Sequence, residues 1–302
     1  MENKKEKLPS ASFSWYPGHM AKTKKQIIQD LKLIDVVVEI RDARIPISSH
    51  NPDIAQIIKN KKRIIILNKA DLADENENKK WVKYFEREGI IAILADCNLG
   101  KGVNESISAI KKVGGDSSIN KNSTNELKRT IVRKKIRVMV IGIPNVGKSS
   151  YINRITKKVS AKVGNKPGVT RQKQWIKLDN TIELLDTPGV LWPKFETNNV
   201  ALNLAFTGTI KDDILDRVDI SYELLKILMK DYIKNIETRY KIENFKSQTL
   251  NPTLELMEQI GINRGALMPG GKVDLEKTAN IILDDFQKRK IRENNIRKSE
   301  IR

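Results

Sequence analysis

The chain has 302 residues, of which 39% are hydrophobic and 31% are charged, enough apolar material for a core in about two domains. Its longest apolar runs have the length of a strand, far short of the roughly 18–20 residues of a transmembrane helix, and the charged N-terminus has no apolar stretch typical of a secretory signal. We therefore expect no membrane partner. The single cysteine, Cys97, excludes an internal disulfide and a cysteine zinc site, which favours a reducing, cytoplasmic location.

The net charge is +19, from 56 Lys and Arg against 37 Asp and Glu. A lysine-rich solvated surface would explain it, and so would a polyanionic partner. The basic residues gather in three segments, at 111–137, 157–177 and 286–302. This clustering favours a nucleic-acid partner over simple solubility, although charge does not distinguish RNA from DNA.

Strands and helices alternate in the first part of the chain. β-Branched runs predict strands, and amphipathic spacing predicts helices, with Ile27, Ile28 and Leu31 on one face and Trp81 and Phe85 on another. The near-continuous apolar strands indicate a parallel, doubly wound sheet. The expected elements are a helix over 22–33, strands over 34–40, 63–67 and 90–94, and a helix over 75–88.

A Gly-, Ser- and Asn-rich segment at 114–130 is predicted to be a linker. A strand over 137–141, a helix from 148 to about 157 and two strands near 174–178 and 182–185 follow it. Only helices are expected after about residue 198, over 214–234, 251–260 and 275–289. We therefore divide the chain into an α/β domain over 1–200 and a small all-α domain over 201–302.

A complete G-x4-G-K-[ST] motif runs from Gly142 to Ser149. Its glycines let backbone N–H groups surround phosphate oxygens, and the helix that follows adds a favourable dipole. Lys148 is expected to reach the β- and γ-phosphates, and Ser149 to ligate Mg²⁺. A glycine-rich turn without function is the alternative, but the expected strand before the motif and helix after it favour a P-loop.

Asp186-Thr187-Pro188-Gly189 matches D-x-x-G, a pattern too short to carry weight alone. Here it ends an apolar strand downstream of the P-loop. In that position Asp186 would hold Mg²⁺ through water, and the Gly189 N–H would sense the γ-phosphate.

Asn68-Lys69-Ala70-Asp71 matches N-K-x-D at the end of a strand. The Asp71 carboxylate can accept two hydrogen bonds from N1–H and the 2-amino group of guanine, donors that adenine lacks. A polar turn without a binding function is the alternative interpretation of this motif, and a generic P-loop ATPase is the alternative for the whole chain. The two motifs together favour guanine nucleotides.

In most GTPases with these motifs N-K-x-D comes last, whereas here it comes first. A doubly wound sheet tolerates such a circular permutation when its original ends lie close together. The expected fold is therefore a circularly permuted Ras-like G domain of the P-loop NTPase class, with a mostly parallel sheet, followed by an all-α domain. The 114–130 linker would join the original ends.

With this motif order, the chain resembles the YlqF/RbgA family of ribosome biogenesis GTPases along nearly its whole length. The resemblance rests on motifs spread along the chain: W-Y-P-G-H-M at 15–20, D-A-R-I-P at 42–46, P-G-V-T at 167–170 and P-G-G at 269–271. It implies a GTPase that binds GTP and GDP, acts on a large ribosomal subunit precursor made of rRNA and ribosomal proteins, and is monomeric off the ribosome.

The resemblance also assigns individual residues. Thr170 would close on Mg²⁺ and the γ-phosphate, and Asn145 would help to hold K⁺. Asp96-Cys97 falls where the family has its S-A base-contact motif, and a Cys97 backbone N–H would replace that of alanine. The full expected GTP-binding set is Asn68, Lys69, Asp71, Asp96, Cys97, Asn145, Val146, Gly147, Lys148, Ser149, Ser150, Thr170, Asp186 and Gly189.

Val190 follows the D-x-x-G motif, where many GTPases have a glutamine that orients water. Valine cannot do so, and intrinsic hydrolysis should be slow. The resemblance points to His19 as the replacement, so that His19, Lys148 and Thr170 form the expected catalytic set. A packing or capping role for His19 is the alternative, whereas His50, the other histidine, has a structural setting.

Two further questions stay open at this stage. Arg41 and Arg44 would either contact RNA or pair with carboxylates such as Asp42 and Asp53. The leading function is a ribosome-assembly GTPase stimulated by the ribosomal particle, and the alternative is a GTP-gated RNA-binding module with little catalysis of its own.

Overall fold

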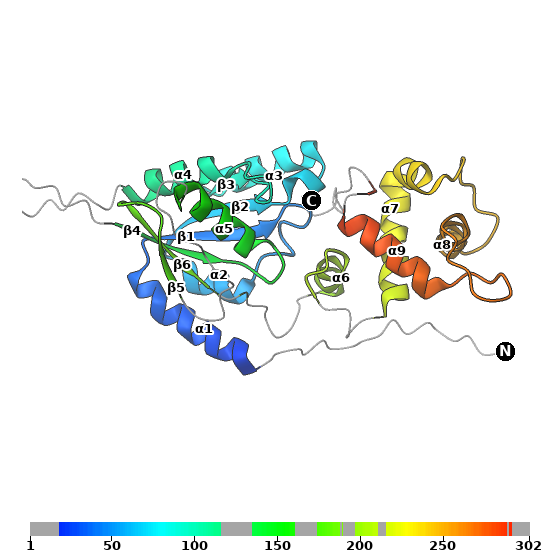
Figure 1. The fold of residues 1–302 in the computed structure, drawn as a ribbon, viewed down its shortest axis with the longest axis horizontal. Coiled ribbons are helices and arrows are strands. Elements are labelled where there is room, and N and C mark those ends of the chain that lie inside the picture. Colours follow the sequence, from blue (N-terminus) through cyan, green and yellow to red (C-terminus); the bar gives the residue numbers. More distant parts are fainter. Residues whose placement is uncertain are drawn as a thin grey trace, which may run out of the picture.

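The computed structural model describes residues 18–115, 135–160, 174–187, 189, 197–210, 216–288 and 290–291. These residues form an α/β part and a helical part that lie next to each other along the longest axis of the molecule (Figure 1). No helix in the described ranges is long and apolar enough to cross a membrane.

A six-stranded sheet with the order β3-β2-β1-β4-β6-β5 forms the centre of the α/β part. All neighbouring strands are parallel except β5, which runs antiparallel to β6 at the edge. The predicted mostly parallel sheet is confirmed. The strands are β1 (Val36–Asp42), β2 (Lys62–Asn68), β3 (Ile91–Leu94), β4 (Ile136–Ile141), β5 (Gln174–Lys177) and β6 (Ile182–Asp186).

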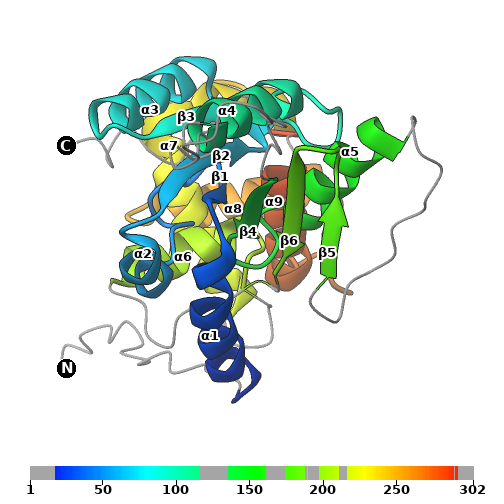
Figure 2. The same cartoon turned by 90° about the vertical axis from the view of Figure 1, so that its left-hand side faces the viewer.

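Helices cover both faces of this sheet, which is why all seven residues of β1 are buried. Ile27 of α1 and Ile54 of α2 line a small cavity with Glu39 of β1, so both helices lie on the same face of the sheet. The helix α3 lies on this face too, because its Trp81 and Phe85 pack with Ile65, the β2 residue that pairs with Glu39. The helices α4 and α5 lie on the other face (Figure 2). The helices are α1 (Gly18–Asp30), α2 (Pro52–Ile58), α3 (Glu75–Arg87), α4 (Val103–Gly115) and α5 (Lys148–Ser160).

The register of the strands brings the sequence motifs to one edge of the sheet. Asp42 lies opposite Asn68 at the carboxyl ends of β1 and β2, and Val140 of β4 lies opposite Asp186 of β6. Counted from β4, the strand order becomes 2-3-1-4-5-6, that of an unpermuted Ras-like G domain. Ligands of doubly wound sheets bind at this edge, next to the switch in strand order.

Among the described residues of the C-terminal part, the helices are α6 (Asn198–Phe206), α7 (Arg217–Tyr240), α8 (Pro252–Asn263) and α9 (Leu275–Gln287). The helices α7, α8 and α9 pack on one another, and α6 packs on α7 and α9. Tyr232 has non-helical backbone angles and kinks α7. The buried apolar side chains of these helices continue the core of the α/β part.

The structure departs from the sequence expectations in several places. The helices α2, α4 and α6 were not expected. Gly114, expected in the linker, belongs to α4. It packs closely against β4, because a Cβ on it would lie 2.5 Å from the Ile136 side chain. Ile28, expected on the inner face of α1, is exposed. A domain boundary at 200/201 would cut α6, and we propose to place it ahead of Asn198.

Candidate guanine-nucleotide site

The loop between β4 and α5 carries the P-loop motif and has the backbone that phosphate binding requires. Gly142, Asn145 and Gly147 have positive φ angles of 152°, 60° and 99°. A Cβ on Gly142 would lie 2.5 Å from the Ile40 carbonyl oxygen, and one on Gly147 would lie 2.1 Å from Nδ2 of Asn68. Only glycine fits these two close approaches, and the loop ends at the N-terminus of α5, where a helix favours anions.

Lys148 begins α5 and is buried beneath the loop, where its Nζ donates to the Ile143 carbonyl at 2.8 Å. Burial lowers the pKa of Lys148 to about 8, against the opposing field of Asp186. The bond to Ile143 holds the ammonium group inside the loop, where a phosphate oxygen would replace the carbonyl.

The D-x-x-G segment approaches the P-loop from β6. A Cβ on Gly189 would lie 2.7 Å from Nζ of Lys148, so this backbone runs directly beside the ammonium group. Thr187 donates its hydroxyl to the Val140 carbonyl at 2.5 Å and fastens the end of β6 to β4. The Ser149 hydroxyl and the Asp186 carboxylate are hard oxygen donors that suit Mg²⁺.

Asn68 ties the separate loops of the site together. Its Nδ2 donates to the Val146 carbonyl of the P-loop at 2.7 Å, and its Oδ1 accepts the Cys97 backbone N–H at 3.0 Å. The side chain is buried, so both ends of the amide are satisfied inside the protein. Asn68 therefore supports the site from behind and holds the P-loop against the loop that follows β3.

A cavity of about 380 Å³ opens beside these loops. Asp71 lies in its wall, on the 3-10 helix Ala70–Leu72. Lys69, in the left-handed backbone region at φ 60°, directs its Nζ to Asp42 at 3.1 Å. The lining residues are Arg44, Asn68, Lys69, Asp71, Leu72, Asp96, Asn98, Asn145, Gly147, Ser150, Thr207 and Gln287.

Cys97, expected to contact the base, does not line this cavity. Cys97 is buried, its N–H is bound to Asn68, and burial raises the pKa of its thiol to about 12, with Asp96 adding to the rise. The cavity wall is formed instead by Asp96 and Asn98. The Asp96 carboxylate accepts the N–H groups of Asn98 and Leu99 and shapes this loop. In this loop Asn98, one residue after Cys97, is therefore the residue beside the cavity.

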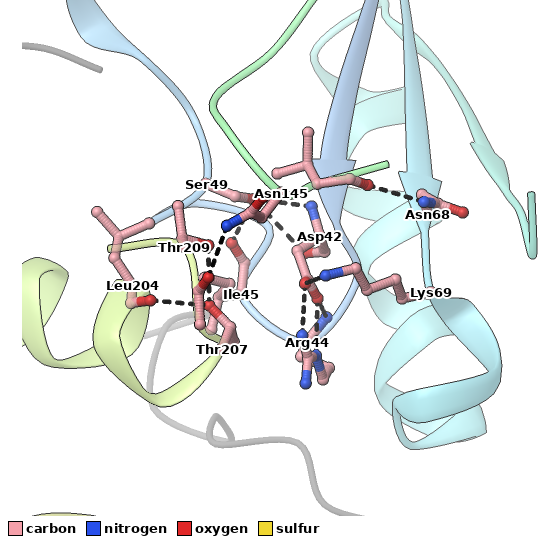
Figure 3. A network of polar contacts seen from close by, with 12 residues as sticks. Asp42, Arg44, Ile45, Ser49, Asn68, Lys69, Asn145, Leu204, Thr207 and Thr209 are labelled. Atoms are coloured by element: carbon pink, nitrogen blue, oxygen red, sulfur yellow. Dashed lines mark hydrogen bonds and ion pairs between the residues drawn. The ribbon is translucent and has the colours of Figure 1, made fainter. Parts of the chain in front are cut away.

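The C-terminal helices reach the same cavity. Thr207, just after α6, and Gln287, at the end of α9, line it, although both lie far along the chain from the G-domain motifs. Asn145 of the P-loop donates from Nδ2 to the Gly208 carbonyl at 2.9 Å. Figure 3 shows Asn145 between the Thr207–Thr209 segment and the Asp42, Arg44 and Lys69 cluster.

Arg41 and Arg44 both pair with carboxylates. Arg41 binds Glu39 through Nε and Nη2, at 2.9 and 3.0 Å, and Arg44 binds Asp42 in the same way, at 2.9 and 2.7 Å. His50 Nδ1 lies 2.7 Å from the Glu39 carboxylate, which agrees with a structural role. Asp53, a candidate partner, pairs with Lys24 instead.

Several expected site residues lie outside the described part of the chain. These are Thr170, Val190 and the side chain of His19, whose backbone is in α1. Among the remaining expected residues, Val146 and Lys148 are buried, Ser149 is exposed and Ser150 faces the cavity. Sequence reasoning did not find Asn98, Leu72, Thr207 and Gln287 in the wall, because no pattern links them to the motifs.

Comparison with known proteins gives concordant results. A family model described as 50S ribosome-binding GTPase matches residues 137–259, beginning at the P-loop strand. Ribosome biogenesis GTPase A of Bacillus cereus is 44% identical over 273 residues, covering 90% of this chain and 89% of the relative. The protein of the same name from Priestia megaterium is 44% identical over 280 residues, covering 93% and 94%.

Solved structures agree with the sequence relatives. The GDP-bound structure of TM YlqF has a TM-score of 0.64 and 26% identity, covering 91% of this chain and 99% of its own. The GNP-bound YlqF from T. maritima has a TM-score of 0.59 and 26% identity, covering 89% and 94%. The motifs, the permuted sheet and relatives of 44% identity along nearly the whole length lead to one conclusion: the chain belongs to the ribosome biogenesis GTPase A family of circularly permuted GTPases.

Proposed function

We propose that this GTPase binds a precursor of the large ribosomal subunit, promotes a late step of its assembly, and is stimulated to hydrolyse GTP by the ribosomal particle. The names of the relatives and the 50S description of the family model support a ribosomal partner. The net charge of +19 suits a surface that binds rRNA. We further propose that the protein works in the cytoplasm and is monomeric off the ribosome.

The proposed base contacts come from two loops. Asp71 accepts N1–H and the 2-amino group of guanine, which gives selectivity over adenine. The backbone of Asn98, in the cavity wall, lies in the loop that would face the guanine O6. When the nucleotide binds, Lys69 gives up its contact with Asp42 and packs over the guanine base.

The proposed phosphate contacts come from the P-loop and from the segments around it. The backbone from Asn145 to Ser150 surrounds the phosphates, and Lys148 binds the β- and γ-phosphates. Ser149, Thr170 and Asp186 would hold Mg²⁺, which neutralises charge on the phosphate oxygens. The Gly189 N–H senses the γ-phosphate.

The chain has no glutamine after D-x-x-G to activate water, because Val190 occupies that position. We assign the role to His19 and propose that K⁺ held by Asn145 supplies positive charge in place of an arginine finger. Turnover off the ribosome should therefore be slow.

The observation that carries the proposed switch is the shared wall of the cavity. Thr207 and Gln287 of the C-terminal helices line the cavity that holds the N-K-x-D and P-loop residues. Nucleotide exchange or loss of the γ-phosphate would therefore change the contacts of the helical part. This change would alter its binding to the ribosomal particle.

A pull-down tests this switch. Ribosomal precursor particles are incubated with the protein bound to GDP or to a non-hydrolysable GTP analogue, and the bound protein is quantified. We expect the analogue to increase binding several-fold. Equal binding in both states would refute the switch.

Stimulated turnover tests the catalytic roles. GTP hydrolysis is measured with and without ribosomal particles, in K⁺ and in Na⁺. We expect particles and K⁺ to raise the rate, and His19→Ala to remove most of the stimulation. Lys22→Ala, an exposed position on the same helix, is the control. A His19→Ala protein with full stimulated turnover would exclude His19 from the mechanism.

A further inference from the structure

Arg44 is a buried cation in the wall of the nucleotide cavity. Its side chain is only 2% exposed, and it follows β1 by two residues, between the N-K-x-D loop and the P-loop. Asn68, Lys69, Asp71 and Gly147 line the same cavity. A guanidinium in this position is either a structural ion pair or a group for the ligand.

The hydrogen bonds of Arg44 leave one nitrogen without an acceptor. Nε and Nη2 donate to the two carboxylate oxygens of Asp42, at 2.9 and 2.7 Å. Nη1 is buried and has no hydrogen-bond partner among the described residues. A buried N–H group without an acceptor is costly, so an acceptor from a ligand is the simplest way to satisfy it.

Arg41 provides the comparison within the same molecule. It makes the same paired contact with Glu39 and is equally buried, but its Nη1 donates to the Pro46 carbonyl at 3.2 Å. Arg41 does not line the cavity. Arg41 therefore has an acceptor for its Nη1 group and Arg44 has none, although Nε of Arg264, which does not line the cavity, also lacks one among the described residues.

The charges around Arg44 favour an electron-rich ligand. Asp42 is buried, which opposes its ionisation, but Arg44 and Lys69 hold the pKa of its carboxyl well below the usual range. One carboxylate thus faces two cations, with Lys69 Nζ at 3.1 Å, so this three-residue cluster carries a net positive charge, while the carboxylates of Asp71 and Asp96 lie elsewhere in the same cavity wall. Figure 3 shows Arg44 and Lys69 converging on Asp42.

The end of α9 holds Arg44 from its other side. The ring centroid of Phe286 lies 5.7 Å from the guanidinium carbon, within the range of a cation–π contact. The neighbouring Gln287 lines the cavity itself. Arg44 is therefore held between the G domain and the C-terminal helices, in the wall of the cavity, and its unpaired Nη1 is buried there.

We propose that Arg44 binds the guanine nucleotide, with Nη1 donating to an oxygen of the ribose or the phosphates. The inference rests on the proposed use of this cavity as the nucleotide site. It adds a residue of the D-A-R-I-P segment to that site and makes Arg44 a link between the nucleotide and α9.

Nucleotide affinity of matched variants tests the inference. Arg44→Lys keeps the charge and loses the Nη1 donor, and Arg41→Lys is the same change in the arginine that does not line the cavity. Dissociation constants for GDP and a non-hydrolysable GTP analogue are measured by displacement of a fluorescent nucleotide, below the melting temperature of each protein. We expect Arg44→Lys to weaken binding about tenfold or more, as for a lost charge-assisted hydrogen bond, and Arg41→Lys to change it less than about twofold.

Guanosine and GDP distinguish the two acceptors. If Nη1 contacts the ribose, Arg44→Lys weakens both ligands, and if it contacts a phosphate, only GDP binding weakens. Wild-type affinity of a folded Arg44→Lys protein would overturn the inference, and so would an equal loss in Arg41→Lys. A wild-type protein that binds no guanine nucleotide would instead refute the proposed site.

A crystal structure of the wild-type protein with GDP gives an answer that does not depend on the folding of a variant. We expect a nucleotide oxygen within about 3.2 Å of Nη1 of Arg44. A bound nucleotide with no atom within hydrogen-bonding distance of this guanidinium would overturn the inference.

Discussion

The amide of Asn145 donates a hydrogen bond to the carbonyl of Gly208 at 2.9 Å. Both residues have left-handed backbone angles, with φ of 60° and 69°. Asn145 belongs to the P-loop and Gly208 to the segment after α6, so one bond connects the phosphate-binding loop with the C-terminal helices. Because a carbonyl oxygen only accepts, Nδ2 must face Gly208, and Oδ1 keeps its acceptor capacity for a cation.

Variants of Asn145 should separate these two roles. Asn145→Ala loses the bond to Gly208 and the oxygen proposed for K⁺, so we expect it to lose K⁺-stimulated GTP turnover and about 0.5–1.5 kcal/mol of stability. Asn145→Asp keeps an oxygen for K⁺ but turns a carboxylate towards the Gly208 carbonyl. It should retain part of the K⁺ response and be no more stable than Asn145→Ala. Full K⁺ stimulation in Asn145→Ala would refute the potassium role.

Asn68→Asp should damage the site without a change of size. Oδ1 can still accept the Cys97 N–H, but a second carboxylate oxygen would face the Val146 carbonyl in place of the amide donor. We expect a loss of about 1–3 kcal/mol in unfolding free energy and at least about tenfold weaker GDP binding, measured by urea denaturation and nucleotide displacement. Wild-type GDP affinity would contradict the bridging role of Asn68.

Gly147→Ala and Gly89→Ala test the close approach at the P-loop. Both glycines have positive φ, at 99° and 70°, but only a Cβ on Gly147 meets another group, Nδ2 of Asn68 at 2.1 Å. Each alanine should cost about 1–2 kcal/mol in backbone strain. Gly147→Ala should also weaken nucleotide binding at least tenfold, while Gly89→Ala leaves it intact. Equal nucleotide affinities of the two variants would contradict this argument.

Acid unfolding should depend on Glu39. Burial opposes its ionisation, yet Arg41 and His50 hold the pKa of Glu39 well below its usual value. A carboxyl with a lowered folded-state pKa stabilises the protein above its unfolded pKa of about 4.3, and this contribution disappears as the pH falls from there towards the folded value. Unfolding free energy should therefore decrease below about pH 5 in urea titrations of the wild type.

Glu39→Gln should flatten that decrease and lower stability at pH 7 by about 3–5 kcal/mol, because Arg41 is left buried without its anion. Glu75→Gln, at an exposed ion pair with Lys79, is the control and should keep the wild-type pH profile. A Glu39→Gln protein with the wild-type slope would show that other carboxyls govern acid unfolding.

Much of the fold followed from local pattern. The strands near 63–67, 137–141 and 182–185 were predicted within about one residue of β2, β4 and β6, because β-branched runs bounded by polar motifs have few alternatives. The helix over 75–88 was predicted with Trp81 and Phe85 inside, and both are buried. The helices α2, α4 and α6 were missed. The segments of α2 and α6 carry too few turns for a periodicity to emerge, and the apolar spacing over 103–115 was not assigned to a helix.

The sequence by itself determined the class of ligand and the sheet, because a P-loop, N-K-x-D and D-x-x-G each depend on residues close together in the chain. Only the tertiary structure decided which groups complete the cavity. It placed Arg44, which has a buried nitrogen without a partner, in one wall together with Thr207 and Gln287, and it bound the Cys97 N–H to Asn68. These contacts join segments far apart in sequence, so their partners are set by packing, which no local pattern encodes.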